Sequence, residues 1–232
     1  MLISWIQKTT LLDYPGKVAT LIFTLWCNLR CKYCHNCEFV LPEKVKEFKD
    51  FIPEEIFFNF LKTKIWILDG VVICWWEPTL QKDLVDFCRK IKQLWFLIKL
   101  DTNWQNPEVL KKLLGESLVD YIAMDIKWDY ENLQDLLWVN YEKEKYLESI
   151  EIIKNSNIDY EFRTTLIKNY HLLNDFEKIV KQIAWSKKYF LQNFRKGNIL
   201  DKNFNWESFL ERELFEFREI ARKYVEKVII RI

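Results

Sequence analysis

Glycine is scarce in this sequence. The chain has 232 residues but only 4 glycines, whereas average usage of about 7% predicts roughly 16. Tryptophan is abundant instead, with 11 residues, and the two counts together make 15. Glycine is the residue that adopts a left-handed backbone without strain, so a chain this poor in glycine has few such residues for its turns and helix ends.

Three other absences narrow the class of protein. Basic and acidic residues number 35 and 34, and this near-zero net charge argues against a dedicated nucleic-acid-binding protein. No apolar run approaches the length of about 18 residues that spans a membrane. Residues 1–16 lack the apolar core and the cleavage site of a secretory signal. We therefore expect a cytoplasmic protein whose partners are neither nucleic acid nor membrane.

The sequence alternates apolar runs with amphipathic segments. We expect strands at six runs rich in Val, Ile, Phe and Tyr: Ala19–Leu25, Gly70–Cys74, Phe96–Thr102, Tyr121–Lys127, Tyr160–Leu166 and Lys188–Phe194. We expect helices between and after them: Pro53–Lys64, Gln81–Leu94, Pro107–Leu114, Tyr141–Asn155, Asn174–Ala184 and Trp206–Glu226. No linker interrupts the pattern, which predicts one domain over residues 1–232.

Strands that alternate with helices indicate parallel βαβ units with right-handed crossovers. Six such units predict an α/β fold, an open or partial (β/α)6 barrel of the TIM type. In such folds the chemistry gathers at the C-terminal ends of the strands. Polar or ligating residues stand in the C-terminal part of every expected strand or just after it: Cys27, Glu77, Asp101, Asp125, the stretch 163–165 that begins with Arg163, and Gln192.

A cluster of cysteines follows the first expected strand. Cys27, Cys31 and Cys34 have the spacing C-x3-C-x2-C. Three thiolates on one loop can hold three irons of a 4Fe-4S cluster and leave the fourth iron open to a small ligand. A zinc site is the alternative, because Cys37 or His35 would complete a set of four ligands.

The other cysteines and the second histidine receive ordinary interpretations. Cys37, within the cluster loop 26–37, is interpreted as a nearby thiol and not as a ligand. Cys74 and Cys88 are expected to be small hydrophobic residues of the core. His171 lies in a polar stretch after the fifth expected strand, which favours a position on the surface.

The cysteine spacing, with an aromatic residue before the third cysteine, resembles the radical S-adenosylmethionine (SAM) superfamily. Further stretches show that the resemblance covers nearly the whole sequence. Together they resemble the glycyl-radical-enzyme activating proteins. Among these, the sequence is most similar to the type that activates anaerobic ribonucleoside-triphosphate reductase. The stretches are Lys8–Lys17, Tyr33–Asn36, Glu77–Thr79, Leu100–Asn103 and Met124–Lys127.

This resemblance implies the partial barrel of the radical SAM enzymes together with their cofactors, a 4Fe-4S cluster and SAM. It implies an activase that reductively cleaves SAM at the cluster and generates a glycyl radical on a partner enzyme. The expected partner is anaerobic ribonucleotide reductase, and the expected electron donor is a flavodoxin or a ferredoxin. Because oxygen destroys such clusters, the resemblance also implies anaerobic life.

The resemblance assigns the cluster to Cys27, Cys31 and Cys34. It places Tyr33 and Asn36 beside the adenosyl group of SAM. The full set of residues to which the resemblance gives a cofactor-binding role is Tyr33, Asn36, Trp75, Trp76, Glu77, Asp101, Thr102, Asn103, Asp125, Lys127 and Arg163.

The strand-end residues of this set receive separate roles from the resemblance. The backbone at 75–76, together with Glu77, is expected to contact the methionyl amine. Asp101, Thr102 and Asp125 are expected to hold SAM, or a monovalent cation beside its carboxylate.

Two basic residues complete the implied site. Lys127 and Arg163 carry fixed positive charge that suits the SAM carboxylate. The alternatives are a simple ion pair between Asp125 and Lys127 and an Arg163 side chain that faces solvent.

The sequence departs from the family at positions where relatives carry glycine. Tryptophan stands at six of them: Trp5, Trp26, Trp75, Trp76, Trp95 and Trp104. Helix ends favour a left-handed glycine, which we expect at Gly70 and Gly115, whereas Trp95 occupies the corresponding junction. One explanation is a UGA codon that the source organism reads as glycine and another genetic code reads as tryptophan. The other explanation is a degenerate protein with a blocked cofactor pocket.

Two further functions stay open on the sequence alone. One is a radical SAM enzyme that acts on a small metabolite, of the deazaguanine synthase kind, although the C-terminal third carries no signature for it. The other is an iron–sulfur or zinc-binding module without SAM chemistry, which genuine tryptophans at the cofactor positions would favour.

Overall fold

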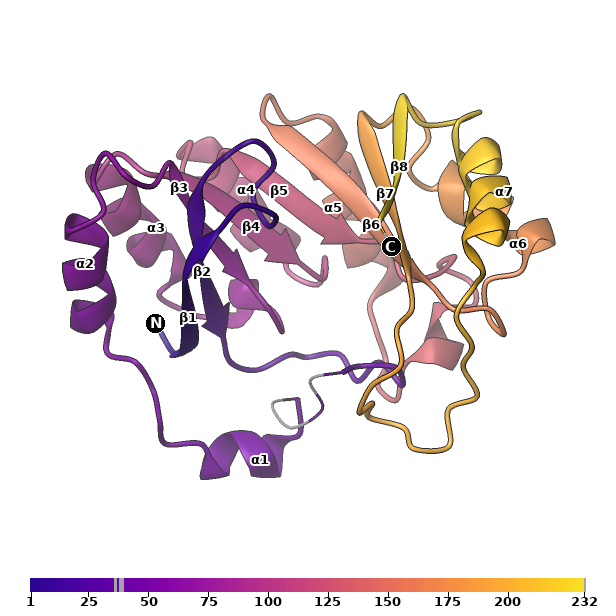
Figure 1. Ribbon diagram of the computed structural model, residues 1–232, viewed down its shortest axis with the longest axis horizontal. Helices are drawn as coiled ribbons and strands as arrows, with labels where there is room; N and C mark the ends of the chain where they lie inside the picture. Colours follow the sequence, from indigo (N-terminus) through magenta and orange to yellow (C-terminus); the bar gives the residue numbers. More distant parts are fainter. Residues whose placement is uncertain (36, 38–39, 232) are drawn as a thin grey trace. The chain divides into compact units, whose positions relative to one another are not determined.

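The computed structural model describes residues 1–35, 37 and 40–231 (Figure 1). The strands are β1 (Ile3–Thr10), β2 (Ala19–Thr24), β3 (Gly70–Cys74), β4 (Leu97–Thr102), β5 (Tyr121–Asp125), β6 (Asp159–Leu166), β7 (Lys188–Asn193) and β8 (Lys227–Arg231). The helices are α1 (Pro42–Glu47), α2 (Glu54–Lys62), α3 (Leu84–Gln93), α4 (Pro107–Gly115), α5 (Lys143–Lys154), α6 (Leu173–Lys181) and α7 (Glu211–Ala221). The described residues also form the short 3-10 helices η2 (Pro78–Leu80) and η3 (Leu133–Leu136).

All six expected strands and all six expected helices are present, which confirms the alternating α/β pattern. The sequence pattern does not predict β1, β8 or α1. The two strands end the strand order β1-β2-β3-β4-β5-β6-β7-β8, and most of their residues are partly or fully exposed. Outer strands need no continuous apolar run. Helix α1 has only six residues and buries none of them, so it has no apolar face to detect.

The chain divides into two compact units. The first comprises Met1–Asn28, Glu38–Ala123 and Ser156–Asp159. The second comprises Leu29–Cys37, Met124–Asn155 and Tyr160–Ile232. Strand β5 passes from the first unit into the second. A single domain over residues 1–232 therefore stays a prediction.

In the first unit β1 pairs antiparallel with β2, while β2, β3 and β4 run parallel. Every residue of β2 and β3 is buried, as is usual for parallel strands that are covered on both faces. Gly70 opens β3 opposite Leu97 of β4. A Cβ atom added to Gly70 would lie 2.7 Å from the Leu97 carbonyl oxygen. The close approach of these two strands therefore accounts for this glycine.

In the second unit β6, β7 and β8 run parallel. Figure 1 shows α6 and α7 side by side, with α7 against β7 and β8. The two helices meet through Phe176 and Phe217, whose ring centroids lie 4.8 Å apart in an edge contact. Parallel pairing in both units confirms the predicted α/β class with parallel strands.

The backbone has an unusual set of left-handed residues. Among the described residues, eight that are not glycine have a positive φ, and seven of these are tryptophans. Gly70 and Gly115 do not have a positive φ, so the prediction that they are left-handed helix ends is wrong. After α4 the left-handed residue is Ser117, two positions beyond Gly115. At the other helix-to-strand junctions with a left-handed residue, that residue is Trp66, Trp95 or Trp185.

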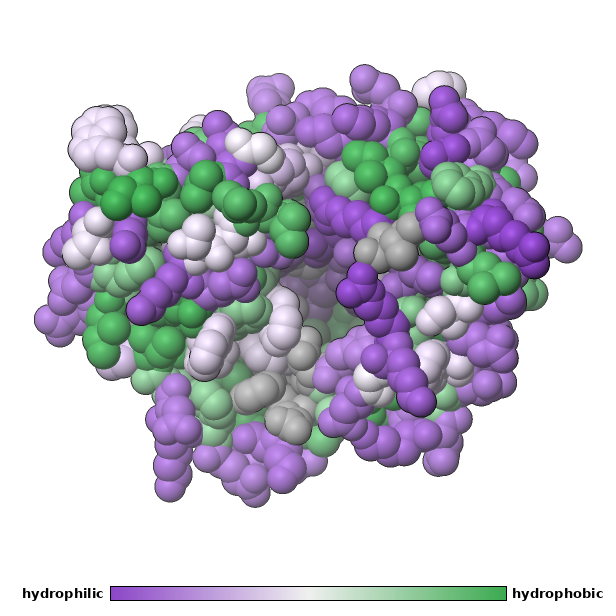
Figure 2. Space-filling view, viewed as in Figure 1, coloured by the Kyte–Doolittle hydropathy of each residue, from purple (hydrophilic) through white to green (hydrophobic). Residues whose placement is uncertain are grey.

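Three of these left-handed tryptophans lie on the surface of the molecule. The face drawn in Figure 2 is largely hydrophilic, with apolar residues in separate patches. Trp66, Trp95 and Trp185 are 98, 92 and 86% exposed. Indoles that are this exposed bury almost no apolar area and so contribute little to the free energy of folding.

None of the helices in the described part of the chain is long and apolar enough to cross a membrane.

Candidate functional site

The second half of the cysteine loop forms backbone hydrogen bonds with other segments of the second unit. Cys31 forms an isolated antiparallel bridge with Leu137, and the Lys32 amide donates to the Leu136 carbonyl at 3.0 Å. The Cys34 amide donates to the Cys31 carbonyl at 2.9 Å, which closes a tight turn between the two residues. The C-x2-C spacing therefore folds as a turn that carries one buried and one partly exposed thiol.

Cys27 belongs to the first unit, where the ends of β3 and β4 hold the start of the loop. The Asn103 side-chain amide donates to the Cys27 Sγ atom at 3.4 Å and to the Asn28 side-chain oxygen at 2.9 Å. The Glu77 amide donates to the Trp26 carbonyl at 3.0 Å. A hydrogen bond to a ligating sulfur is an outer-shell contact that tunes a bound metal.

The donor set of this loop fits an iron–sulfur cluster by its chemistry. None of the six cysteines, all of which lie in the described part of the chain, forms a disulfide. Thiolates are the protein ligands of iron–sulfur clusters. Within the described residues no three His, Cys, Asp or Glu side chains are grouped as a metal site, and Cys27 lies in a different unit from Cys31 and Cys34. The assignment of these three ligands therefore stays a prediction that rests on thiol chemistry and spacing.

Glu77 is fully buried and accepts hydrogen bonds from four donors. It caps η2 by accepting from the Thr79 amide at 3.1 Å and from the Thr79 hydroxyl at 2.5 Å. It also accepts from the Thr102 hydroxyl at 2.8 Å and from the Asn103 amide at 2.5 Å. Burial raises the pKa of Glu77 above its ordinary value, although the four hydrogen bonds oppose this rise. Glu77 thus joins the end of β3 to the end of β4, and its contact with the methionyl amine stays a prediction.

Asp101 has a basic partner, Lys99, which is not among the predicted site residues. The Lys99 ammonium donates to the Asp101 carboxylate, and the Lys99 side chain is buried. Residues two apart on a strand point to the same face, so the Lys-x-Asp spacing in β4 was a readable signal for this pair. The Lys99 Nζ atom also lies 5.9 Å from the centroid of the Tyr121 ring. The predicted cofactor role of Asp101 is not tested by these contacts.

Three of the predicted residues lie together in the second unit. Arg163 Nε donates to Asp125 Oδ1 at 3.1 Å, and Lys127 Nζ donates to Asp125 Oδ2 at 3.1 Å. The side chains of Lys127 and Arg163 are only 14 and 15% exposed, which rules out an Arg163 that faces solvent. Two cations against one carboxylate leave this group with a net positive charge. We call Asp125, Lys127 and Arg163 the charged trio.

The environment of the charged trio keeps Asp125 and Lys127 ionised. Burial works against the ionised form of Asp125, but Lys127 and Arg163 hold its pKa below the ordinary value. Burial also works against the charged form of Lys127, but the nearby Asp125 carboxylate raises its pKa well above the ordinary value. The positive charge is therefore fixed in place, as a site for an anionic ligand requires.

Tyr33 lies beside the charged trio. The Lys127 Nζ atom is 5.9 Å from the centroid of the Tyr33 ring. The same ring lies 6.3 Å from the ring of Phe194 and 6.2 Å from that of Phe204. A role beside the adenosyl group stays a prediction for Tyr33, and Asn36, which has the same expected role, lies outside the described residues.

His171 is buried, so the prediction of a surface position is wrong. It is 1% exposed, its Nε2 atom lies 3.0 Å from the Lys127 carbonyl oxygen, and its Nδ1 atom accepts from the Ile167 amide at 3.0 Å. Burial lowers the pKa of His171 to about 4. The polar stretch after β6 turns inward at this residue because the imidazole satisfies backbone groups, which no local sequence pattern reveals.

The remaining cysteines follow their ordinary interpretations. Cys74 and Cys88 are buried, which confirms that they belong to the core, and burial raises the pKa of Cys88 to about 12. The Asn198 side-chain amide lies 3.8 Å from the Cys37 Sγ atom. The interpretation of Cys37 as a thiol that is not a ligand stays a prediction.

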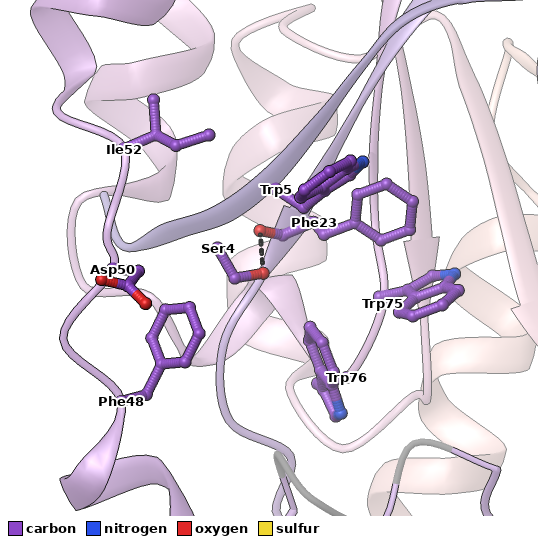
Figure 3. Close-up of a pocket in the computed structure, with 8 residues that line it drawn as sticks. All are labelled: Ser4, Trp5, Phe23, Phe48, Asp50, Ile52, Trp75 and Trp76. Carbon is purple, nitrogen blue, oxygen red and sulfur yellow. Dashed lines mark hydrogen bonds between the residues drawn. The ribbon is translucent and has the colours of Figure 1, made fainter.

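A pocket of about 600 Å³ opens beside the ends of β2 and β3 in the first unit (Figure 3). Trp75 and Trp76 line it, and Figure 3 shows the rings of Trp5, Phe23 and Trp75 close together. The Trp75 ring makes edge contacts with Phe23 at 4.4 Å and with Trp76 at 5.5 Å between centroids. Two indoles therefore line the space next to the backbone that is expected to contact the methionyl amine.

Comparison with known proteins identifies a family. A model described as the radical SAM superfamily matches residues 21–183. Two proteins of Methanocaldococcus jannaschii, each named "Putative glycyl-radical enzyme activating enzyme", are 34 and 31% identical to this chain. The first match covers 99% of this chain and 95% of the relative, and the second covers 89 and 78%. The similarity to the first relative therefore runs almost the whole length of both proteins.

Solved structures of the same fold are more distant in sequence. SuiB of Streptococcus suis bound to S-adenosylmethionine matches with a TM-score of 0.67 at 12% identity, over 91% of this chain and 50% of that chain. Methylornithine synthase (PylB) matches with a TM-score of 0.62 at 14% identity, over 90% of this chain and 63% of that chain. This chain spans about half the length of SuiB. Together with the family model, these likenesses confirm the predicted fold class, a partial TIM-type barrel of the radical SAM kind.

Proposed function

Because this chain belongs to the radical SAM superfamily, we propose that it is an activating enzyme that generates a glycyl radical on a partner protein. The observation that carries the proposal is the 34% identity, over 99% of the chain, to a relative named for that activity. When bound, the 4Fe-4S cluster and SAM supply a one-electron cleavage whose radical product removes a hydrogen atom from glycine. The residues of this chain bind, orient and shield these groups.

The proposed role of the first unit is to bind the cluster through one of its three cysteine ligands. Cys27 ligates one iron, with Cys31 and Cys34 as the other two ligands. The Asn103 amide donates to the Cys27 sulfur, and Glu77 fixes the backbone of Asn103. Asn103 therefore tunes the cluster through a ligand, and Glu77 is a positioning residue one step further out.

The proposed role of the charged trio in the second unit is to bind the carboxylate of SAM. The charged trio supports this role because it carries one positive charge in excess, on side chains that are mostly buried. Asp125 orients both cations through its two carboxylate oxygens. A monovalent cation held by Asp101, Thr102 and Asp125 beside the SAM carboxylate is part of the same proposal.

We assign the partner to the class of anaerobic ribonucleotide reductase, with a backbone glycine of that enzyme as the substrate. The support is the N-terminal stretch Lys8–Lys17, which resembles the activases of that reductase. A flavodoxin or a ferredoxin is the proposed electron donor. We place the reaction in an oxygen-free cytoplasm, in keeping with six cysteines that form no disulfide.

The proposal is tested by anaerobic reconstitution of the full chain with iron and sulfide, followed by dithionite and SAM. We expect a protein-bound iron–sulfur absorption band and the release of 5′-deoxyadenosine. Cys31→Ser should lose both, whereas Cys37→Ser, a matched change on the same loop, should keep both. A chain that binds zinc in place of the cluster, or that loses the cluster equally in both variants, would contradict the proposal.

A further inference from the structure

Left-handed backbone and tryptophan coincide in this chain. Seven tryptophans have φ between 50° and 80°: Trp26, Trp66, Trp75, Trp76, Trp95, Trp104 and Trp185. We infer that these seven positions are glycine in the working protein, encoded by UGA codons that the source organism reads as glycine. The part of the inference that concerns the cofactor pocket rests on the proposed function, whereas the part that concerns the helix ends does not.

The first argument is steric. In an L-residue a left-handed backbone brings the Cβ atom too close to the following carbonyl oxygen, and bulky residues with this backbone are outliers. Glycine has no Cβ atom and adopts the conformation freely. Within the described residues, the other left-handed positions are Gly16 and Ser117. Tryptophan supplies 11 of the 232 residues but seven of these nine positions, a bias that no property of the indole explains.

The second argument comes from the helix ends. Trp66, Trp95 and Trp185 each lie between a helix and the following strand, where a left-handed glycine commonly ends the helix. Their side chains are almost wholly in water, so packing does not select them. The Trp95 amide donates to the Lys92 carbonyl at 2.9 Å, which is a backbone bond that glycine would keep. Among these three helix-end positions, the family resemblance indicates glycine only at Trp95. The left-handed backbone indicates glycine at Trp66 and Trp185 as well.

The third argument comes from the strand ends. Trp26, Trp75, Trp76 and Trp104 follow β2, β3 and β4. The Trp26 carbonyl accepts from Glu77, and the Trp75 carbonyl accepts from the Thr24 hydroxyl at 2.8 Å. The two tryptophans take part in these contacts only through their backbone carbonyls, so glycine would preserve both contacts.

Glycine at positions 75 and 76 would also change the pocket of Figure 3. Both indoles line that pocket. Without them its wall beside Glu77 becomes bare backbone, which an amino-acid group such as the methionyl end of SAM can approach. Trp104 is a different case because its indole is fully buried, so there the backbone alone carries the inference.

The other four tryptophans serve as an internal comparison. Trp5, Trp128, Trp138 and Trp206 do not have a positive φ. Trp128 packs against His171 at 5.9 Å between centroids, and Trp206 packs against Phe194 at 4.9 Å. Backbone handedness gives no reason to replace these four residues, and it does not support the family-based suspicion about Trp5.

A stability test separates the backbone from the side chain. A Trp66→Gly, Trp95→Gly, Trp185→Gly triple variant should melt higher than the parent chain, by roughly 2–4 °C for each position. The matched Trp66→Ala, Trp95→Ala, Trp185→Ala triple removes the same indoles but keeps the strained backbone, so it should not reproduce the gain. Trp138→Gly, at a position without left-handed backbone, should lower the melting temperature. Equal melting of the two triples, or a loss with glycine, would overturn the inference for the helix ends.

A binding test addresses the pocket. Equilibrium dialysis of SAM against the cluster-loaded chain, without reductant, should show at least tenfold tighter binding for Trp75→Gly, Trp76→Gly than for the parent chain. No gain in this arm, together with the stability gain above, would contradict the cofactor pocket and leave the inference for the helix ends standing.

The deciding experiment uses the protein from its own cells. Peptide masses across residues 71–99 and 182–187 should show glycine at positions 75, 76, 95 and 185, and the gene should carry UGA at each of them. Tryptophan masses, or UGG codons at these positions, would overturn the inference.

Discussion

The strand ends of the two units hold two carboxylates in opposite surroundings. Glu77, after β3, is fully buried and accepts hydrogen bonds from four donors, none of which carries a charge. Asp125, at the end of β5, is 35% exposed and meets two cations. Burial raises the pKa of Glu77, whereas Lys127 and Arg163 lower the pKa of Asp125 against the effect of burial.

The carboxylate of Glu77 meets neutral donors that belong to the backbone and to hydroxyl groups, whereas the carboxylate of Asp125 meets two side-chain cations. The oxygens of Glu77 accept hydrogen bonds from Thr79 of η2, Thr102 of β4 and the backbone of Asn103, so Glu77 holds the end of β4 against the start of the cysteine loop, and its contact with the methionyl amine stays a prediction. The charged trio has one positive charge that Asp125 does not neutralise.

Removal of the Glu77 carboxylate should have the largest effect on stability. Glu77→Ala leaves four buried donors without an acceptor, and we expect a loss of about 3–5 kcal/mol of unfolding free energy. Glu77→Gln should cost less, because one oxygen still accepts. Urea unfolding measures both. Glu108→Ala, on the exposed surface of α4, is the control and should change stability by less than about 0.5 kcal/mol. A Glu77→Ala variant as stable as this control would contradict the role of Glu77 as the acceptor that holds the end of β4.

His171 contacts the backbone of the charged trio, because its Nε2 atom lies within hydrogen-bond distance of the Lys127 carbonyl oxygen. Burial lowers its pKa from 6.5 to about 4, so the unfolded chain takes up the proton first as the pH falls. Stability that is fully present above pH 6.5 should therefore decline between 6.5 and 4, by about 3 kcal/mol in all. Unfolding measured across this range should show the decline in the parent chain and not in His171→Gln. An identical slope in both would show that another group is responsible.

Loss of a cation from the charged trio should weaken SAM binding more than it weakens the fold. Lys127→Met removes the excess positive charge, and we expect about a 10- to 100-fold rise in the SAM dissociation constant. Lys127→Arg should recover part of the affinity. Lys178→Met, at an exposed position on α6, is the matched control and should bind SAM like the parent chain. Equal binding by all three variants would contradict a carboxylate site at the charged trio.

Asn103 should give the smallest but most specific effect. Asn103→Ala removes the donor to the Cys27 sulfur, so the cluster should become harder to reduce. The expected fall in potential is roughly 20–60 mV, the one-electron equivalent of a hydrogen bond worth about 0.5–1.5 kcal/mol. An electron-paramagnetic-resonance redox titration measures it, and Asn106→Ala on the same segment is the control. An unchanged potential would remove Asn103 from the cluster's surroundings.

The sequence was informative about the elements that carry continuous apolar runs. Strands β2 to β7 are rich in apolar and aromatic residues, most of which are buried, whereas β1 and β8 have partly exposed faces and α1 has no apolar face. Spacing also placed the acidic residues at the strand ends. It could not show that the Glu77 carboxylate points inward to four donors, since that depends on how η2 and β4 pack.

Two other features of the site depend on three-dimensional packing. The burial of His171 follows from a return of the chain after β6 that satisfies backbone groups of Lys127 and Ile167. The pairing of Lys99 with Asp101 had a sequence signal, because the two residues share one face of β4. Backbone handedness at Trp66 and Trp185 had none, because their surroundings in the sequence contain no turn dipeptide.

The proposed activity of this chain is the generation of a glycyl radical on another protein. Its most direct test is the electron-paramagnetic-resonance spectrum of an anaerobic ribonucleotide reductase from the same organism, mixed with the cluster-loaded chain, reductant and SAM. We expect the doublet of a glycyl radical, which Cys31→Ser and omission of SAM both abolish and which Cys37→Ser retains. Release of 5′-deoxyadenosine with no radical signal on this or any other glycyl radical enzyme of the organism would contradict the claim and favour a small-metabolite substrate.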